Sequence, residues 1–185
     1  MQEILIHYLQ ESFELSADET DAIQSLFTPL SVSEGSILLD KGQIADFIVF
    51  VAEGVMRMHE FDQKGNDVTK FFFKENQFVT NLDSYHTGRP SEFCIQTLTP
   101  CRLFIIKKND TLKIARWPEI FNKLVQKELH KKVQDQYYLR NHNAREKYER
   151  FIRQDGDIVN RVPLQYIASY LGIVPQSLSR IRRSV

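Results

Sequence analysis

The sequence has little of what metal centres and membrane spans require. Its 185 residues include two cysteines and five histidines, which are scattered along the chain. An iron–sulfur cluster needs about four thiolates, and a cupin-type metal enzyme is usually signalled by a His-x-His pair, so neither is expected. No apolar run reaches the roughly 18 to 20 residues that cross a bilayer. The N-terminus lacks a basic region and a cleavage site, so we expect no export signal and a cytoplasmic protein.

Motifs of common catalytic sites are missing as well. The sequence contains no glycine-rich phosphate loop, no nucleophile elbow and no Cys–His pairing of a known kind. Cys94 and Cys101 lie in apolar, strand-like segments without metal-ligand spacing, and we expect them to be buried free thiols. These absences predict a protein that is not an enzyme and holds no metal.

The formal net charge is zero, but the charges are unevenly distributed. Residues 1–139 carry 15 Lys and Arg against 20 Asp and Glu, a balance of −5. Residues 140–185 carry 9 against 4, a balance of +5. A basic segment at one end of a neutral chain favours a nucleic-acid contact at that end.

The last residues, 162–185, have the pattern of two short helices joined by a tight turn. Apolar residues recur at helical spacing over Leu164–Leu171, and Gly172 can adopt the left-handed backbone that ends a helix. Pro175 opens a second helix, in which Leu178 and Ile181 are expected to point inward. The residues expected to contact DNA are Gln176, Ser177, Ser179, Arg180, Arg182 and Arg183. This pattern is typical of a helix-turn-helix, with an ordinary helical hairpin as the alternative.

Upstream, residues 1–28 are predicted to be helical, and the region from Leu30 to Ile106 has the two-residue period of β-strands. In the helical part, Ser16 and Glu19 have the spacing of a capping box. The residues predicted to share one helix face are Ile4, Leu5, Tyr8 and Leu9. The strand-like segments are Ser36–Leu39, Phe47–Val51, Val55–Phe61, Val68–Phe73, Gln77–Leu82, Phe93–Thr97 and Arg102–Ile106. Many short strands with closely spaced turns indicate a small β-barrel or sandwich.

From about Asn109 the sequence is predicted to be helical for roughly forty residues. Apolar residues recur there at four-residue spacing: Phe121, Val125, Leu129, Val133 and Tyr137. A spacing of four drifts around a helix of 3.6 residues per turn, so this stripe winds about the axis. Such a helix packs either on its own barrel or on a second copy of itself. We favour the second arrangement, in which the five residues form the interface of a homodimer.

The order of these parts resembles the Crp/Fnr family of bacterial transcription regulators. The most specific segments are the glycine-punctuated Phe47–Val55 and the terminal Ile167–Gly172. The segment Ala144–Phe151 also resembles the family's junction between its dimer helix and its DNA-binding domain. The resemblance implies an α+β fold with N-terminal helices, a jelly-roll-like double-stranded β-roll, a long dimerisation helix and a C-terminal helix-turn-helix.

The resemblance also implies domains and partners. The expected domains are a β-roll sensor over residues 1–115, a dimerisation helix over 116–145 and a DNA-binding domain over 146–185. Two recognition helices of the dimer would meet successive turns of double-stranded DNA, roughly 34 to 36 Å apart. RNA polymerase is a further candidate partner. In the family a β-hairpin wing follows the recognition helix, whereas this sequence ends at Val185, so no wing is expected in it.

The family's cyclic-nucleotide site is incomplete in this sequence. In the family, a Gly-Glu pair and a later Arg hold the ribose and the phosphate. In this sequence Thr80 and Asn81 occupy the positions of the Gly-Glu pair, and Ser91 occupies the position of the Arg. The ligand-pocket positions carried over from the family are Phe78, Thr80, Asn81, Leu82, Arg89, Ser91 and Glu92. We expect no standard cAMP site, although Arg89 is a candidate substitute cation.

Three alternatives stay open at this point. The effector of the protein is either an unidentified small molecule or absent. His86, in the loop of the incomplete cassette, is the one candidate axial ligand for haem. The alternative function is a small-ligand-binding module that acts through a protein partner and not through DNA.

Overall fold

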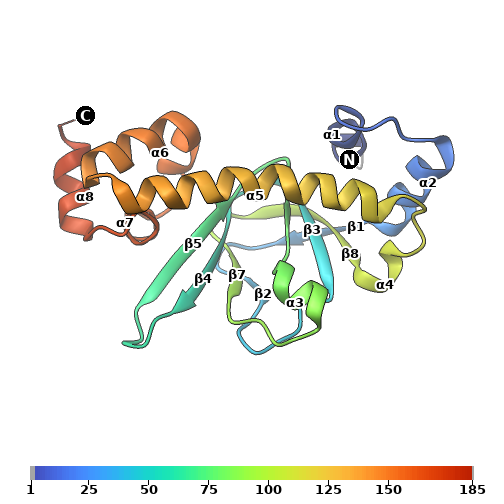
Figure 1. Ribbon diagram of the computed structural model, residues 1–185, viewed down its shortest axis with the longest axis horizontal. Coiled ribbons are helices and arrows are strands. Elements are labelled where there is room, and N and C mark those ends of the chain that lie inside the picture. Colours follow the sequence, from blue (N-terminus) through green and yellow to red (C-terminus); the bar gives the residue numbers. More distant parts are fainter. Residues whose placement is uncertain (1–2, 185) are drawn as a thin grey trace.

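Eight antiparallel strands form two four-stranded sheets in the middle of the molecule (Figure 1). The computed structural model describes residues 3–184. The strands are β1 (Thr28–Val32), β2 (Ile37–Leu39), β3 (Phe47–Glu53), β4 (Met56–Phe61), β5 (Asp67–Phe73), β6 (Gln77–Val79), β7 (Cys94–Thr97) and β8 (Cys101–Lys107). Their order is β1-β8-β3-β6 in one sheet and β2-β7-β4-β5 in the other. The predicted β-roll is confirmed.

One strand was not predicted, and one predicted strand was too long. Strand β1 was not predicted, because Pro29 interrupts its short apolar pattern; it pairs with β8 at the edge of its sheet, where a proline is tolerated. The strand predicted over Gln77–Leu82 ends at Val79. The chain turns there because Asn81 accepts a hydrogen bond from the Ser84 amide and starts helix α3 (Leu82–Thr87).

One close approach between strands requires a glycine. Gly54 has φ +111°, and a Cβ built on it would lie 2.4 Å from Cys101 Sγ. Its amide donates to Glu75 Oε1 at 2.8 Å. Any side chain at this position would clash with β8, so Gly54 fixes the turn between β3 and β4. Cys94 and Cys101 are buried and free, as predicted.

Helices α1 (Glu3–Gln10) and α2 (Ala17–Leu26) pack on the roll at the N-terminal end. The capping box is confirmed: Glu19 N donates to Ser16 Oγ at 3.2 Å, and Ser16 N donates to Glu19 Oε2 at 2.9 Å. The predicted apolar face of α1 is shifted by about one position. Ile4 is 42% exposed and Ile6 is buried beside Leu5 and Leu9. No helix in the described part of the chain is both long and apolar enough to cross a membrane.

Helix α5 (Trp117–Asn141) runs along the length of the molecule, across the roll (Figure 1). The prediction of a continuous helix of about forty residues from Asn109 was wrong. The short α4 (Lys108–Thr111) is followed by a break, and a second break at His142 separates α5 from α6 (Ala144–Val159). Asn143 caps α6 because its side chain accepts from the amides of Arg145 and Glu146.

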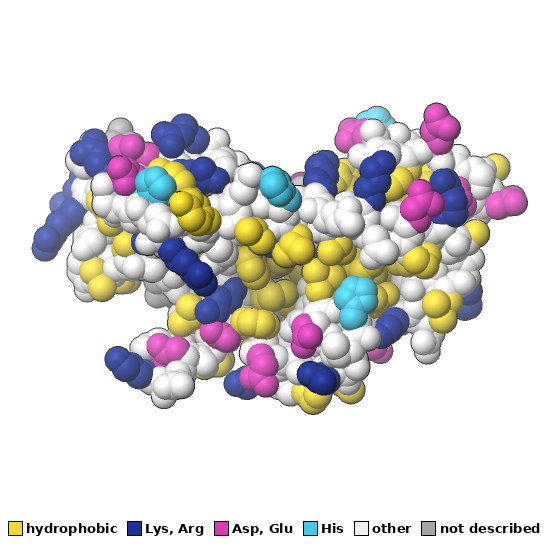
Figure 2. All heavy atoms as spheres, in the orientation of Figure 1, with side chains coloured by type: hydrophobic (Ala, Val, Ile, Leu, Met, Phe, Trp, Pro, Cys, Tyr) yellow, Lys and Arg dark blue, Asp and Glu magenta, His cyan; other side chains and the backbone are white. Residues whose placement is uncertain are grey.

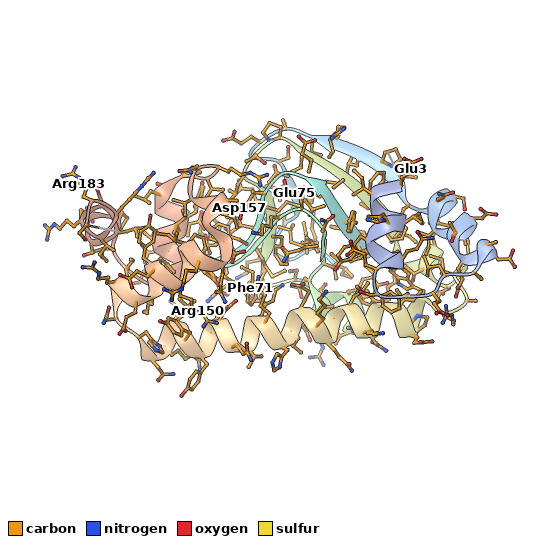
Figure 3. The ribbon with its side chains drawn as sticks, turned by 90° about the horizontal axis from the view of Figure 1, so that it is seen from above. Glu3, Phe71, Glu75, Arg150, Asp157 and Arg183 are labelled. Carbon is orange, nitrogen blue, oxygen red and sulfur yellow. The ribbon has the colours of Figure 1, made fainter. Side chains whose placement is uncertain are left out.

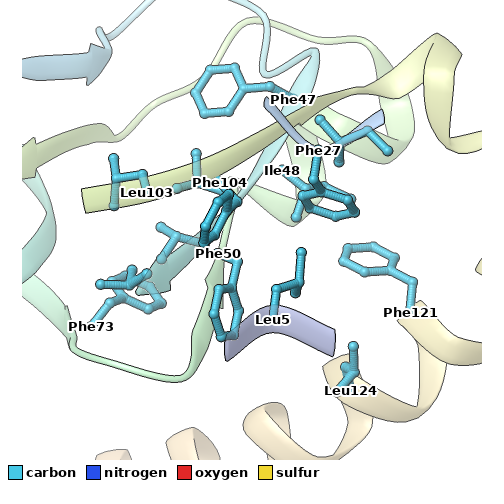
Figure 4. Close-up of a cluster of buried hydrophobic side chains, with 14 of the residues drawn as sticks. Leu5, Phe27, Phe47, Ile48, Phe50, Phe73, Leu103, Phe104, Phe121 and Leu124 are labelled. Atoms are coloured by element: carbon cyan, nitrogen blue, oxygen red, sulfur yellow. The ribbon is translucent and has the colours of Figure 1, made fainter. Parts of the chain in front are cut away.

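The start of α5 belongs to the core of its own chain. Phe121 and Leu124 point toward Leu5 and Phe27 in the main hydrophobic cluster (Figure 4). A second cluster joins α6, α7 (Leu164–Leu171) and α8 (Pro175–Arg182) to Val55 at the end of the roll. The C-terminal helices are therefore packed on the roll through shared apolar surface.

Candidate nucleic-acid interface and roll pocket

Helices α7 and α8 form the predicted helix-turn-helix. Gly172 ends α7 with φ +67° and ψ 37°, in the left-handed region, and its amide donates to the carbonyls of Ala168 and Ser169. Val174 precedes α8 without a side-chain cap, and Pro175 occupies the first turn. Leu178 is fully buried. The apolar spacing read from the sequence therefore marks the inner faces of both helices.

The outer face of α8 carries the residues predicted to contact DNA. Gln176, Arg180, Arg182 and Arg183 are exposed, whereas Ser177 and Ser179 are half-buried. Within the described residues, no hydrogen bond or ion pair engages the side chains of the four exposed residues. Arg183 lies at the outer end of the molecule, far from Glu3 (Figure 3). The structure thus brings an unpaired basic face to a protruding helix.

One basic residue near this face was not predicted. Arg145, in the first turn of α6, donates to the Ser184 carbonyl at 3.3 Å and pairs with Glu149 at 2.9 Å. It therefore lies beside the end of α8. The basic excess of residues 140–185 includes this arginine, but its place beside α8 depends on how α6 folds back.

A seam of polar and aromatic contacts holds α7 against β5. Ser169 Oγ accepts from the Thr69 amide at 3.0 Å and donates to the Asp67 carbonyl at 3.1 Å. Phe72 packs edge-on to Tyr170, with ring centroids 5.3 Å apart. The orientation of α8 relative to the roll is fixed through these contacts.

A second contact of the seam is ionic. Arg161 donates to both oxygens of Glu75, at 2.6 and 3.0 Å, and lies 3.5 Å from Asp157. Burial opposes the ionisation of Glu75, but hydrogen bonds from Arg161 and the Gly54 amide outweigh it and lower the pKa of this carboxyl to about 2. The carboxylate is therefore charged at neutral pH and bonded from both sides of the seam.

An apolar pocket of about 490 Å³ lies between the roll and α5. Figure 2 shows hydrophobic side chains gathered in the hollow beneath α5. Of the predicted ligand-pocket residues, Thr80, Asn81 and Leu82 line this pocket. Phe78 lines a smaller cavity beside it, whereas Arg89, Ser91 and Glu92 line neither. The remaining lining residues come mainly from β4, β5 and α5.

The polar groups of the cassette bond to one another or to the backbone of the roll. Thr80 Oγ1 donates to the Phe47 carbonyl at 2.8 Å, and Asn81 Nδ2 donates to Ser91 Oγ at 2.6 Å. Ser91 Oγ in turn donates to the Phe93 carbonyl at 2.7 Å. These hydroxyl and amide groups hold the loop in shape, so they have little capacity left for a ribose or a phosphate.

The charged residues of the cassette point away from the pocket. Arg89 and Glu92 are exposed, and Glu92 pairs with Lys41 at 3.2 Å. Arg89 therefore lines neither the pocket nor the smaller cavity beside it.

Two cations that the sequence did not single out line the pocket, Lys132 and the exposed Arg140. Lys132 Nζ lies 4.0 Å from the ring centroid of Phe73 and 4.7 Å from that of Phe71. Lys132 follows Leu129 by three positions, so it lies on the neighbouring edge of the apolar stripe and faces the roll. The only sign of this contact in the sequence was a lysine beside the apolar stripe. Its aromatic neighbours on β5 are distant in sequence, so the contact itself could not be predicted.

His86 offers little support for haem ligation. It is exposed, and its ring lies edge-on to Tyr85, with centroids 5.6 Å apart. Within residues 3–184, no three His, Cys, Asp or Glu side chains lie close enough together to hold a metal ion.

Comparisons with known proteins identify the roll. Residues 29–116 match the cyclic nucleotide-binding domain family, a range that runs from β1 past β8. FixK2 from Bradyrhizobium japonicum superposes with a TM-score of 0.73 at 15% identity, over 85% of this chain and 83% of that one. A transcriptional regulator of the Crp/Fnr family from Eubacterium rectale gives 0.72 at 16% identity, over 96% and 87%.

The chain has the Crp/Fnr fold. CLP from Xanthomonas campestris, described as a c-di-GMP-responsive global regulator, also superposes, with a TM-score of 0.69, 15% identity and 91% of both chains covered. No curated protein sequence matches the chain. The predicted α+β architecture and the resemblance are confirmed. Of these structures, the Eubacterium rectale protein is described as a transcriptional regulator of the Crp/Fnr family and CLP as a global regulator.

Proposed function

We propose that this protein is a homodimeric, sequence-specific DNA-binding transcription regulator whose roll has no standard cAMP site. The observation that carries the proposal is the unpaired basic face of α8, the second helix of a helix-turn-helix in a Crp/Fnr fold. Such a helix enters the major groove with its outer side chains toward the base edges. The predicted domain boundaries at 115 and 145, a cytoplasmic location and RNA polymerase as a partner remain predictions.

Two exposed residues of α8 have the spacing of a reading surface. Gln176 and Arg180 follow one another at i and i+4, so they lie along one side of the helix. Gln pairs with adenine and Arg with guanine through two hydrogen bonds each. Because no acidic residue occurs in α8, the phosphate backbone meets no repulsion from this helix.

Homodimer formation is supported by the far half of α5. Leu129, Val133 and Tyr137 are 52, 60 and 70% exposed, and they follow one another at four-residue spacing. The proposed interface is smaller than the five predicted residues. Phe121 is buried in its own chain and Val125 packs partly against that core, so the proposed interface rests on the three exposed residues.

The effector part of the proposal rests on the cassette. Its hydroxyl and amide groups are bonded internally, and its one arginine, Arg89, lies outside the pocket. A phosphate held at the cassette would therefore lack both the arginine and the free donors of the standard site, which costs several kcal/mol. We therefore propose that any effector of this protein differs from cAMP.

Selection of bound DNA from a random pool tests the function. The recovered sequences should share a site with two-fold symmetry and half-sites about one helical turn apart. The variant with both Gln176 and Arg180 changed to alanine should recover no shared site. Enrichment of no site by the wild type would overturn the proposal and favour a ligand-binding module that acts through a protein partner.

A further inference from the structure

We infer that the pocket between the roll and α5 binds a small apolar anion: an aromatic or aliphatic body that carries one carboxylate or similar acidic group, held by Lys132. This inference deepens the proposed function, because it assigns a ligand class to the effector pocket. The binding itself requires neither DNA nor the standard nucleotide cassette.

The apolar wall of the pocket determines that the body of the ligand is apolar. Met58, Phe71, Leu82, Phe93 and Leu129 line it with apolar surface. Its volume of about 490 Å³ lies within the range of pockets for small molecules, roughly 300 to 1,000 Å³. The contacts available over most of the ligand are therefore apolar ones.

The head group is set by the ammonium of Lys132. Among the described residues, no hydrogen bond or ion pair reaches this ammonium, and its neighbours are the ring faces of Phe71 and Phe73. Burial lowers the pKa of Lys132 to about 8, against the opposing effect of Glu128. A cation in apolar surroundings is costly unless an anion pairs with it, and a ligand anion would supply that partner.

The other polar groups of the pocket do not compete strongly for this role. Glu128, which lines the smaller cavity beside the pocket, accepts a hydrogen bond from Gln77 Nε2 at 3.4 Å and forms no ion pair with Lys132. Asp83 and Arg140 lie at the exposed rim, so each is hydrated. A single unpaired ammonium favours a ligand with one negative charge over a doubly charged phosphate monoester.

The placement of the pocket connects its ligand with the proposed dimer. Leu129, Val133 and Tyr137 line the open side of the pocket and also form the proposed interface. A second copy packed on this stripe would close the pocket over the ligand. A bound ligand would then add contacts between the two α5 helices, which position the two helix-turn-helix units.

Two fluorescent probes with the same aromatic body isolate the role of the charge. 8-Anilinonaphthalene-1-sulfonate carries an anionic group that N-phenyl-1-naphthylamine lacks. We expect saturable binding of the sulfonate by the full chain and a loss of about tenfold or more in its affinity on Lys132→Met, because a charge-assisted hydrogen bond contributes about 1.5 to 3 kcal/mol. The neutral probe should lose less than about twofold, since only its apolar contacts are involved.

Matched variants decide the site. Lys127 is exposed on the same helix and lines neither cavity, so Lys127→Met should leave both affinities unchanged. Leu82→Trp should fill the pocket and weaken both probes, with the fold checked by circular dichroism. Equal losses of both probes on Lys132→Met, a matching loss on Lys127→Met, or no saturable binding by the wild type would overturn the inference. Because the titration contains no DNA, its result is independent of the DNA selection.

Discussion

The guanidinium of Arg57, on strand β4, lies 3.9 Å from the ring centroid of Tyr166 on helix α7. Arg57 is 2% exposed and donates to both oxygens of Asp67, at 2.8 and 2.5 Å. The buried cation is thus paired with a carboxylate and covered by an aromatic face, two contacts that stabilise it together. Residues far apart in the chain therefore fix α7, and with it α8, against the roll.

Replacing Arg57 by methionine should lower the free energy of unfolding by about 2 to 4 kcal/mol, because Asp67 would keep its charge without the partner. The loss is smaller than for a fully enclosed pair, since the side chain of Asp67 is 33% exposed. Urea unfolding measures it. Arg102→Met is the matched control: its pair with Glu53 is more than half exposed, so the cost should stay below about 1 kcal/mol. Equal costs for the two variants would contradict this role for Arg57.

The seam between the C-terminal helices and the roll should weaken in acid, because protonation of Glu75 removes its ion pair with Arg161. Its pKa is about 2 in the folded protein and near 4.5 in the unfolded chain, so its contribution is complete above pH 4.5 and is lost as the pH falls toward 2. Glu75→Gln should therefore reduce the loss of unfolding free energy between pH 5 and pH 2.5. Urea unfolding at several pH values measures the slope. A variant with the slope of the wild type would contradict the ion pair with Arg161.

The local patterns of the sequence predicted the elements better than their contacts. Helix spacing and Gly172 were enough for the helix-turn-helix, because both signals are local. The sequence could not predict which part of the α5 stripe is buried. Phe121 and Leu129 belong to the same four-residue repeat, but the roll covers Phe121 and leaves Leu129 exposed. The contact of Arg57 with Tyr166 likewise depends on tertiary packing.

The same limit applies to the two candidate sites. The departures at Thr80, Asn81 and Ser91 were readable because they occupy known family positions. Lys132 was not readable, since its significance comes from Phe71 and Phe73 on a strand that is distant in sequence. A lysine near an apolar stripe is otherwise typical of a solvated helix edge.

The exposed stripe on α5 should make the protein a dimer. One chain has a mass of 21.7 kDa, so light scattering at micromolar concentration should give twice that value. Changing both Leu129 and Val133 to aspartate should yield monomers or aggregates, because unpaired charges would be buried at the interface. Lys127→Asp, outside the stripe, should leave the dimer intact. A wild-type mass of one chain would exclude the proposed interface.

Cyclic AMP should bind with a dissociation constant weaker than about 1 mM, because the cassette supplies no arginine beside the phosphate and its hydroxyl and amide donors are already bonded. Titration calorimetry of the wild-type protein measures this directly. Micromolar binding would refute the proposal for the cassette. In that case Arg89→Ala would test whether this arginine turns into the pocket when the ligand is present.

Replacing Arg180 on α8 and replacing Arg183 directly after it should change DNA binding in different ways. Arg180, one turn beyond Gln176, is placed to read a base edge, so Arg180→Ala should cost about 1 to 3 kcal/mol per half-site and relax preference at one base pair. Arg183 follows the last turn of α8 and should meet a phosphate. Arg183→Ala should weaken binding to all sequences alike and reduce the salt dependence by about one unit of slope. A panel of operator variants, measured at two salt concentrations, separates the two effects. A uniform loss of affinity for Arg180→Ala, with its sequence preference kept, would mean that another residue of α8 reads the DNA.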